Sequence, residues 1–205
     1  MNSTIKKALE NSISYQEYRL LIEKLVEEKS TTGKEKTQEN ITFTLLNNQR
    51  MKRWDKTIKA TDAVKEKIQV FNQSTTWLVI TESWCGDAAH VLPVINTVAT
   101  LNKNIALRIV LRDENAELMD AFLTEGARSI PKLIMIDNAT GEVIQTYGPR
   151  PSTATKMVNA YKAKHGKLTP EFKEELQHWY NKNKGQDIIA DLVSLLCELD
   201  ATVCL

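Results

Sequence analysis

Two apolar runs in the middle of the chain constrain the fold most strongly: TWLVIT (residues 76–81) and IALRIVL (residues 105–111). Short runs of this kind, rich in β-branched residues and almost uninterrupted, are typical of strands buried on both faces of a sheet. Between them, residues 86–101 carry apolar side chains at helical spacing. A strand, a helix and a second strand in this order predict an α/β fold, with helices flanking a central sheet.

The next segment predicts two more strands. Residues 115–124 pair apolar side chains at helical spacing, and the apolar segments 132–137 and 142–146 then flank the turn Asn-Ala-Thr-Gly at residues 138–141. Two apolar segments around such a turn are typical of a β-hairpin. The predicted sheet is therefore mixed, with two parallel crossovers and one hairpin.

Helical segments precede and follow this α/β core. Residues 15–30 and 51–71 have apolar stripes, and a polar loop, residues 31–40, separates them. The C-terminal part is expected to be helical to its end, with Thr169 as an N-cap and Gly185 as a break. We therefore divide the chain into three parts that form one compact unit: an N-terminal helical extension (1–59), a core domain (60–165) and a C-terminal helical extension (166–205).

The charge balance excludes several classes of partner. The 205 residues include 27 Lys and Arg against 26 Asp and Glu, which gives a net charge of +1. Nucleic-acid binding and polybasic membrane anchors need a surplus of cations, so neither nucleic acid nor a membrane is expected as a partner. The sequence has no run of about 18 apolar residues that would predict a membrane-spanning helix. Its N-terminus lacks the apolar stretch of a secretory signal, so we expect a cytoplasmic protein.

The segment Trp84-Cys85-Gly86-Asp87-Ala88 follows the first predicted strand and opens the first core helix. A thiol in this place faces the unpaired N–H groups and the positive end of the helix dipole, which favour the thiolate. Because the thiolate is the attacking species in disulfide exchange, Cys85 is a candidate nucleophile. Asp87 opposes this effect, since its carboxylate repels a negative charge on sulfur. The alternative is that Cys85 is a small buried apolar residue.

Three further features accompany this motif. Pro93 lies inside the helix that follows Cys85, Ile130-Pro131 directly precedes the strand predicted at 132–137, and Gly148 follows the hairpin. In this combination, over roughly residues 60–165, the chain resembles the thioredoxin superfamily. More narrowly, it resembles a thioredoxin-like subgroup whose motif is W-C-G-D-A or W-C-G-D-C.

The resemblance implies a thioredoxin-like fold with a cis proline beside the thiol. It implies that Cys85 is the exposed nucleophile and that Trp84 and Gly86 lie beside it on the docking surface. It also implies that Ile130 and Pro131 form the edge where a substrate backbone pairs. Asp87, which lies within the motif, is the candidate acid or base for the thiol chemistry.

Two departures from the family pattern limit the expected chemistry. Ala88 stands where the second cysteine of the usual C-x-x-C pair would be, and Val79 stands where the family has a buried acid. Without the second thiol, Cys85 forms a mixed disulfide but lacks the internal thiol that releases it. Release then requires glutathione, a protein thiol, or a distant cysteine of the chain, Cys197 or Cys204.

The predicted function is therefore single-cysteine thiol–disulfide exchange with a protein thiol or disulfide as partner. The alternative is a non-catalytic binding module that uses the groove beside Pro131. His165 and His178 have no Cys or His neighbour at metal-ligand spacing, so neither a metal nor another cofactor is expected. The leucine-rich last helix either covers apolar surface or forms a homodimer contact.

Four residues near these features have simpler interpretations. Cys197 is expected to pack among the leucines of the last helix, and Cys204 to fray at the terminus. His90 is expected to be a surface residue or a neighbour of the site, and not a base for the thiol. Glu82, like Asp87, is by default a solvated surface residue.

Overall fold

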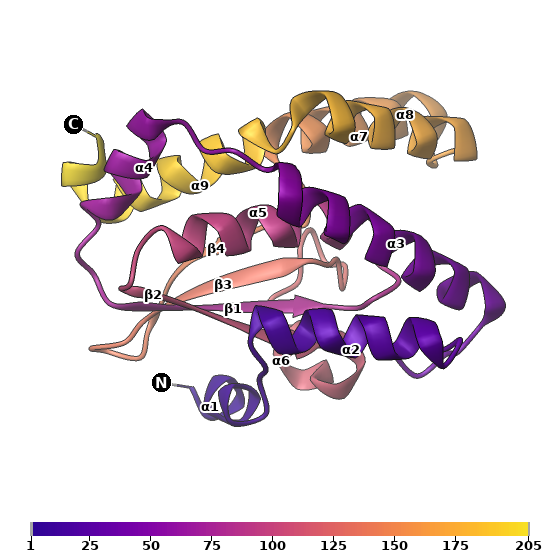
Figure 1. Cartoon of the computed structure of the whole chain (residues 1–205), viewed down its shortest axis with the longest axis horizontal. Coiled ribbons are helices and arrows are strands. Elements are labelled where there is room, and N and C mark those ends of the chain that lie inside the picture. Colours follow the sequence, from indigo (N-terminus) through magenta and orange to yellow (C-terminus); the bar gives the residue numbers. More distant parts are fainter. Residues whose placement is uncertain (1, 205) are drawn as a thin grey trace.

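The computed structural model describes residues 2–204 and has one four-stranded sheet with helices on both faces (Figure 1). The strand order is β2-β1-β3-β4. The strands are β1 (Thr75–Thr81), β2 (Ile105–Leu111), β3 (Lys132–Asp137) and β4 (Val143–Tyr147). All four predicted strands are therefore confirmed, and the bounds of β1 and β4 differ from the prediction by a single residue.

The sheet is mixed, but it contains one parallel pair where two were predicted. β1 is parallel to β2, whereas β3 is antiparallel to both β1 and β4. The connecting helix is short: α6 (Ala116–Ala121) has six residues and rises about 9 Å, so it does not carry the chain back along the face of the sheet. A seven-residue strand spans about 23 Å. The chain therefore enters β3 at the edge where β1 ends and runs back alongside it.

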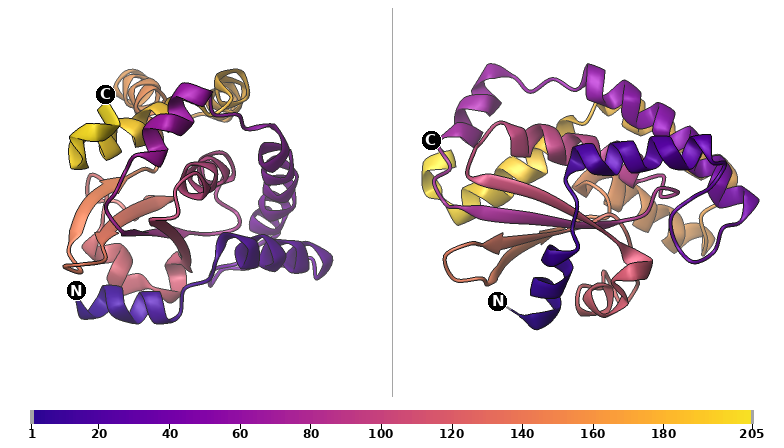
Figure 2. Two further views of the ribbon diagram at one scale, coloured as in Figure 1. Left: turned by 60° about the vertical axis from the view of Figure 1, so that its left-hand side comes forward. Right: turned by 60° about the horizontal axis from the view of Figure 1, so that its bottom comes forward.

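The remaining helices form the two layers that cover the sheet. They are α1 (Ser3–Glu10), α2 (Tyr15–Glu27), α3 (Gln38–Thr57), α4 (Asp62–Gln69), α5 (Ala88–Thr100), α7 (Ser152–His165), α8 (Pro170–Asn183) and α9 (Gln186–Leu199). α5 covers one face, where α3 and α9 contact it, and α1 contacts α6 on the opposite face. Figure 2 shows these two layers from the side.

The alternation of side chains along the strands divides the core into two clusters. Trp77 and Val79 of β1 lie in the cluster that includes α5 and α9. Leu78 and Ile80 of β1 lie in the cluster that includes α1 and α6. All four are fully buried, as predicted for β1. β2 differs from the prediction because it is an edge strand, and its residue Ala106 is exposed.

The N-terminal helices differ from the predicted ones. α1 is missed by the sequence pattern because two buried side chains are too few for a periodic signal. The loop expected at 31–40 ends early because the Thr37 side chain caps α3, accepting the N–H of Asn40 at 3.2 Å. The apolar stripe 51–71 is divided between α3 and α4 because Thr61 caps α4. Polar capping residues, and not the apolar stripe, determine these helix ends.

The C-terminal helices pack against α5. Gly185, between α8 and α9, has φ +77°, and a Cβ there would lie 2.8 Å from a methyl group of Val94 in α5. A glycine therefore permits the close approach of this junction to α5. At the other end of α9, a disulfide joins Cys197 to Cys204, whose Cα atoms are 5.2 Å apart. Figure 1 shows this end of the chain beside α4.

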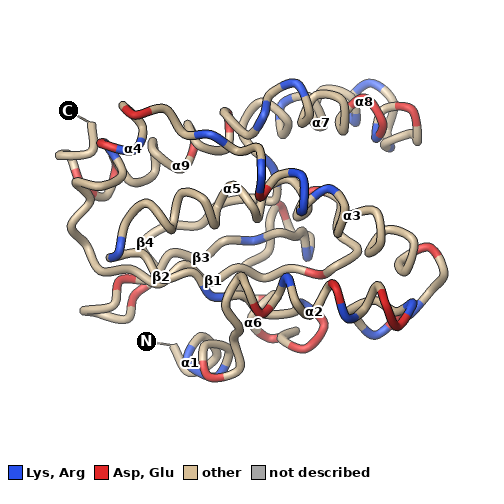
Figure 3. The backbone as a smooth tube through the Cα atoms, in the orientation of Figure 1, with Lys and Arg blue, Asp and Glu red and all other residues tan. Residues whose placement is uncertain are grey.

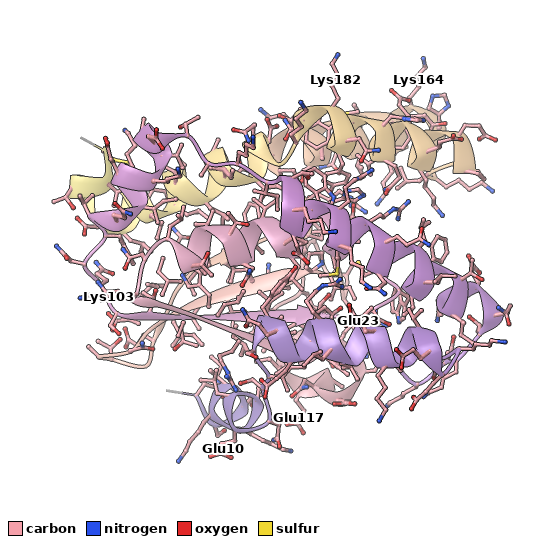
Figure 4. All side chains as sticks on the ribbon, viewed as in Figure 1. Glu10, Glu23, Lys103, Glu117, Lys164 and Lys182 are labelled. Atoms are coloured by element: carbon pink, nitrogen blue, oxygen red, sulfur yellow. A yellow bond between two sulfur atoms is a disulfide. The ribbon has the colours of Figure 1, made fainter. Side chains whose placement is uncertain are left out.

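Charged side chains of both signs are distributed over the outside of the molecule. Figure 3 shows Lys and Arg interspersed with Asp and Glu along the helices. Glu10, Lys164 and Lys182 point away from the sheet (Figure 4). Within residues 2–204, no helix is both long and apolar enough to cross a membrane.

Candidate functional site

Cys85 lies in the turn between β1 and α5, beside the segment that enters β3. Its thiol donates a hydrogen bond to the backbone carbonyl of Ile130, with a distance of 3.2 Å between Sγ and oxygen. The Ile130–Pro131 peptide bond is cis. The fold thus brings the cysteine motif and the Ile130-Pro131 step together, as the resemblance implies.

Cys85 is buried and is not the exposed nucleophile that the resemblance implies. The residue is 8% exposed and shares a buried cluster with Ala88, Leu118 and Met119. Burial raises the pKa of Cys85 to about 12, and the carboxylate of Asp87 adds to the rise. The N–H groups of Asp87 and Ala88 lower the pKa, as predicted for a helix start, but the loss of solvation outweighs them. The resting group is therefore a thiol.

Asp87 is enclosed by the protein and is not a solvated surface residue. Its side chain is 12% exposed, and one carboxylate oxygen lies 2.6 Å from an Arg150 nitrogen. The other oxygen accepts a hydrogen bond from the Tyr180 hydroxyl at 3.1 Å. Burial raises the pKa of Asp87, while Arg150 and Tyr180 oppose the rise. Because Tyr180 belongs to α8, the C-terminal extension contributes directly to the surroundings of the motif.

His90 is buried, so the expectation of a surface residue is wrong, and it is a neighbour of the site. The Trp54 indole N–H donates to His90 Nδ1 at 2.9 Å, and His90 Nε2 lies 2.7 Å from the side-chain oxygen of Gln177. The imidazole stacks on the Tyr180 ring at 4.4 Å. Burial lowers the pKa of His90 to about 3, so the ring is neutral. His90, in α5, thus connects α3 through Trp54 and α8 through Gln177.

Glu82 is also buried, contrary to its expected surface position. It has no exposed surface, and one carboxylate oxygen accepts the N–H of Asp113 at 2.9 Å. Burial raises the pKa of Glu82. This contact connects the turn before the motif to the 3-10 turn η1 (Arg112–Glu114), which follows β2.

A group of buried polar side chains holds Ser83, the residue that precedes Trp84. Its Oγ lies 2.8 Å from Oγ1 of Thr44 and accepts the N–H of Thr32 at 3.0 Å. The Thr32 hydroxyl accepts the Ser83 N–H at 2.8 Å, and Asn47 donates to the Ser83 carbonyl at 2.9 Å. Sequence reasoning misses these residues, because hydroxyl and amide side chains in a loop and a helix give no periodic signal.

Trp84 forms one side of a polar pocket of about 440 Å³. The guanidinium of Arg112 lies 4.8 Å from the centre of the Trp84 ring and pairs with Asp113 at 2.9 Å. Arg128, in the loop that leads to Ile130, lines the same pocket. The complete lining is Lys34, Glu35, Asn40, Trp84, Arg112, Asp113, Ala116 and Arg128. The pocket therefore extends from the motif to the loop that carries the cis proline.

Gly86, the third motif residue, lies beside α3. A Cβ at this position would lie 3.8 Å from a guanidinium nitrogen of Arg50. Its surroundings thus include a cation from the N-terminal extension. No group of three or more His, Cys, Asp or Glu among residues 2–204 is placed to hold a metal ion.

Cys197 and Cys204 are bonded to each other, so neither is free to release a mixed disulfide from Cys85. Cys197 packs against the core cluster around α5, as predicted, whereas Cys85 lies in the cluster on the opposite face of the sheet. Cys204 does not fray: it belongs to the 3-10 turn η2 (Ala201–Cys204), in which Val203 is fully buried. Cys85 is the free cysteine.

The sequence matches the family model described as Thioredoxin over residues 33–164. The chain belongs to the thioredoxin family. Two solved structures share its fold at 17% sequence identity. A protein of unknown function from Pseudomonas aeruginosa, PA1234, superposes with a TM-score of 0.58 over 76% of this chain and 89% of its own. An HIV epitope scaffold has a TM-score of 0.55 over 90% of this chain and 98% of its own.

At this level of identity the two structures establish the fold of this thioredoxin-family chain and nothing more. No curated protein matches the chain at a significant level. The thioredoxin-like fold with additional helices at both ends is confirmed. The family match ends at residue 164, so Gln177 and Tyr180 of α8, which contact His90 and Asp87, lie beyond it.

Proposed function

We propose that this thioredoxin-family protein carries out single-cysteine thiol–disulfide exchange on a protein disulfide, with Cys85 as the nucleophile. The observation that supports this proposal best is the 3.2 Å contact between Cys85 Sγ and the Ile130 carbonyl, beside the cis bond to Pro131. The motif at residues 84–88 is that of the W-C-G-D-A subgroup, which supports the same chemistry.

The reaction has two exchange steps. In the first, the Cys85 thiolate attacks a substrate disulfide R–S–S–R′: the bond Cys85–S–S–R forms, the substrate S–S bond breaks, and R′–S⁻ leaves and takes up a proton. In the second, a thiol R″–SH from solution, either glutathione or a protein thiol, loses its proton and attacks the sulfur of R: the bond R″–S–S–R forms, the bond between R and Cys85 breaks, and the Cys85 sulfur takes up a proton as it leaves. Because Ala88 offers no internal thiol, the mixed disulfide is long-lived.

Docking of the substrate frees the Cys85 thiol from its hydrogen bond to the Ile130 carbonyl. A substrate backbone that pairs with the Ile130-Pro131 edge donates to the Ile130 carbonyl, which otherwise accepts the Cys85 thiol. Trp84 and Gly86 contact the substrate on the side of the motif. Asp87 takes the thiol proton and passes it to the leaving thiolate. Burial raises the pKa of Asp87, which makes this carboxylate a better proton acceptor than a solvated one.

One observation favours a second function, a binding module that uses the groove beside Pro131 without turnover. Cys85 is 8% exposed, and burial raises the pKa of its thiol to about 12, so the resting protein holds little thiolate. In this function the groove binds an extended segment of a partner, and the thiol serves as a small apolar contact.

An extended peptide with a central cysteine tests the two functions. The cysteine carries a chromophoric thiol as a mixed disulfide, and the same disulfide of free cysteine is the matched small substrate. Exchange predicts one equivalent of released chromophore and a peptide adduct on Cys85 by mass spectrometry, formed faster than the adduct with free cysteine. Cys85→Ser forms no adduct. Saturable peptide binding without any adduct on Cys85 would establish the binding module instead.

Release of the mixed disulfide by glutathione places this proposed cycle in a reducing compartment such as the cytoplasm. The Cys197–Cys204 bond is the feature that favours an oxidising compartment.

Addition of glutathione to the isolated peptide adduct measures the second step directly, since it regenerates the free Cys85 thiol and releases the peptide.

A further inference from the structure

Asp87, Arg150 and Tyr180 form an enclosed charged cluster at the N-terminal end of α5. Arg150 comes from the segment between β4 and α7, and Tyr180 comes from α8. The Arg150 side chain is 23% exposed and pairs with Asp87 through a terminal nitrogen at 2.6 Å. Its Nε is buried and has no hydrogen-bond partner within residues 2–204. The guanidinium therefore has a donor that the ion pair does not use.

Cys85 stands two residues before Asp87, in the turn that leads into α5. The charge of Arg150 lowers the pKa of Cys85 and that of Asp87 raises it. If the thiol proton moves to Asp87, the cluster changes from thiol, carboxylate and guanidinium to thiolate, carboxylic acid and guanidinium. The net charge is zero in both states, so the transfer does not leave an uncompensated buried charge, which is the costly alternative.

We propose that Arg150 is a positioning residue that pairs with the Cys85 thiolate once Asp87 has taken the thiol proton, and that Tyr180 controls how readily Asp87 takes it. The Tyr180 hydroxyl donates to the carboxylate of Asp87 and therefore favours the state in which the proton stays on sulfur. The catalytic purpose of this arrangement rests on the proposed exchange, but the ionisation of Cys85 is measured without any disulfide.

Other titratable groups around Cys85 and Asp87 remain in place in every variant below. They are Tyr18 of α2, Arg50 of α3, Glu82 after β1 and His90 of α5. α6 contributes the apolar side chains Leu118 and Met119.

The rate of Cys85 alkylation by iodoacetamide as a function of pH tests the proton transfer. Peptide mapping by mass spectrometry follows Cys85, with the Cys197–Cys204 disulfide intact. A proton shared between Cys85 and Asp87 gives a constant fraction of thiolate between the two pKa values, so the rate is independent of pH across the neutral range. In Asp87→Asn the plateau disappears and the rate rises about tenfold per pH unit up to the pKa of Cys85.

Arg150 is tested in the background of Asp87→Asn, so that no carboxylate is left without its partner. Asp87→Asn/Arg150→Gln is expected to raise the midpoint of Cys85 ionisation by about one pH unit above that of Asp87→Asn. Asp87→Asn/Arg150→Lys, which keeps the charge, is expected to return the midpoint most of the way to that of Asp87→Asn. An unchanged midpoint in the glutamine variant would overturn the assignment of Arg150.

Tyr180→Phe removes the hydroxyl and keeps the ring that stacks on His90. It is expected to raise the alkylation rate on the plateau about tenfold, because the carboxylate loses a hydrogen bond to a charged group. Tyr161→Phe is the matched control, since the Tyr161 hydroxyl contacts Thr169 and not the cluster. If Tyr180→Phe and Tyr161→Phe have the same alkylation rate on the plateau, the role of Tyr180 is contradicted. If the alkylation rate of the wild type rises with pH without any plateau, the proton transfer is contradicted. A plateau without any mixed disulfide would overturn the proposed exchange and leave this inference standing.

Discussion

Gly148 lies so close to Pro131 that a Cβ at position 148 would stand 2.3 Å from the carbonyl oxygen of Pro131. The backbone of Gly148 has φ +100°, a conformation that residues with a side chain rarely adopt. Space and backbone conformation therefore both require glycine. The end of β4 thus holds the proline segment next to Cys85.

Gly148→Ala is expected to lower the free energy of unfolding by about 3 kcal/mol, because the methyl group overlaps the backbone of Pro131 and the residue is strained. Gly126→Ala is the matched control: its φ is +76°, but apart from its two chain neighbours no residue among 2–204 has an atom within 4 Å of the added Cβ. We expect a cost of about 1 kcal/mol there. Urea unfolding measures both, and equal costs would contradict a close contact at Gly148.

Ala88→Cys should convert single-cysteine exchange into turnover. The new thiol stands three residues after Cys85 at the start of α5, and a held neighbouring thiol attacks a mixed disulfide far faster than one from solution. The expected result is a shorter lifetime of the peptide adduct on Cys85, followed by mass spectrometry without added glutathione. Ala89→Cys, one residue further along the helix, is the control. If the adduct is equally stable in both variants, the groove does not hold the two sulfurs in the geometry of exchange.

Cys204→Ser breaks the Cys197–Cys204 disulfide and tests whether the C-terminal cysteines affect the chemistry of Cys85. Loss of this short loop closure is expected to cost about 2 kcal/mol of stability. The rate of peptide capture by Cys85 should not change, because the disulfide lies on the other side of the sheet. A slower capture or an altered adduct lifetime in Cys204→Ser would show that the C-terminal cysteines take part in the exchange after all.

His90 should make the protein less stable in acid. Its pKa is about 3 in the folded chain and about 6.5 in the unfolded chain, so between these values the unfolded chain binds more protons. The contribution of the neutral imidazole is complete above pH 6.5 and decreases by about 1.4 kcal/mol per pH unit as the pH falls toward 3. Asp87, whose pKa is raised, changes with the opposite sign but is common to wild type and variant.

The measurement is the difference in the free energy of unfolding between wild type and His90→Gln. This difference should shrink by about 3 kcal/mol between pH 7 and pH 4. His178→Gln is the control, since the His178 side chain is 75% exposed and pairs with Glu174 at the surface. A difference for His90→Gln that does not depend on pH would mean that the imidazole is not buried as a neutral ring.

The sheet follows from patterns that act locally, whereas the meeting of Cys85 with Ile130, 45 residues apart, is implied only by the resemblance to the thioredoxin superfamily. β1 and β3 are predicted because continuous apolar runs have few other structures open to them. The antiparallel direction of β3 is missed because it depends on the length of α6, which the apolar spacing in the sequence overestimates. Thr61 shows the same limit, since one capping side chain divides a stripe that looks continuous.

The burial of the site could not be read from the sequence. Cys85 stands at a helix start, and that position alone favours a thiolate, but the final pKa depends on how much water the surrounding elements remove. Tyr180 and Gln177 lie more than 80 residues from the groups that they contact. Tyr180 fits the apolar stripe of α8 equally well as a packing residue. Only the folded chain shows that its hydroxyl reaches Asp87.

The contacts of α8 with Asp87 and His90 also bear on how the protein can be divided. Residues 33–164 contain every residue of the motif and of the cis-proline loop, yet a chain cut after residue 164 would lose the phenol on Asp87 and the amide on His90. Grafting that segment onto another scaffold would transfer Cys85, Asp87 and Arg150 without the Tyr180 hydroxyl that donates to Asp87. The family domain at residues 33–164 therefore does not include all of the residues that enclose Asp87 and His90, and a fragment made for experiments should include α8.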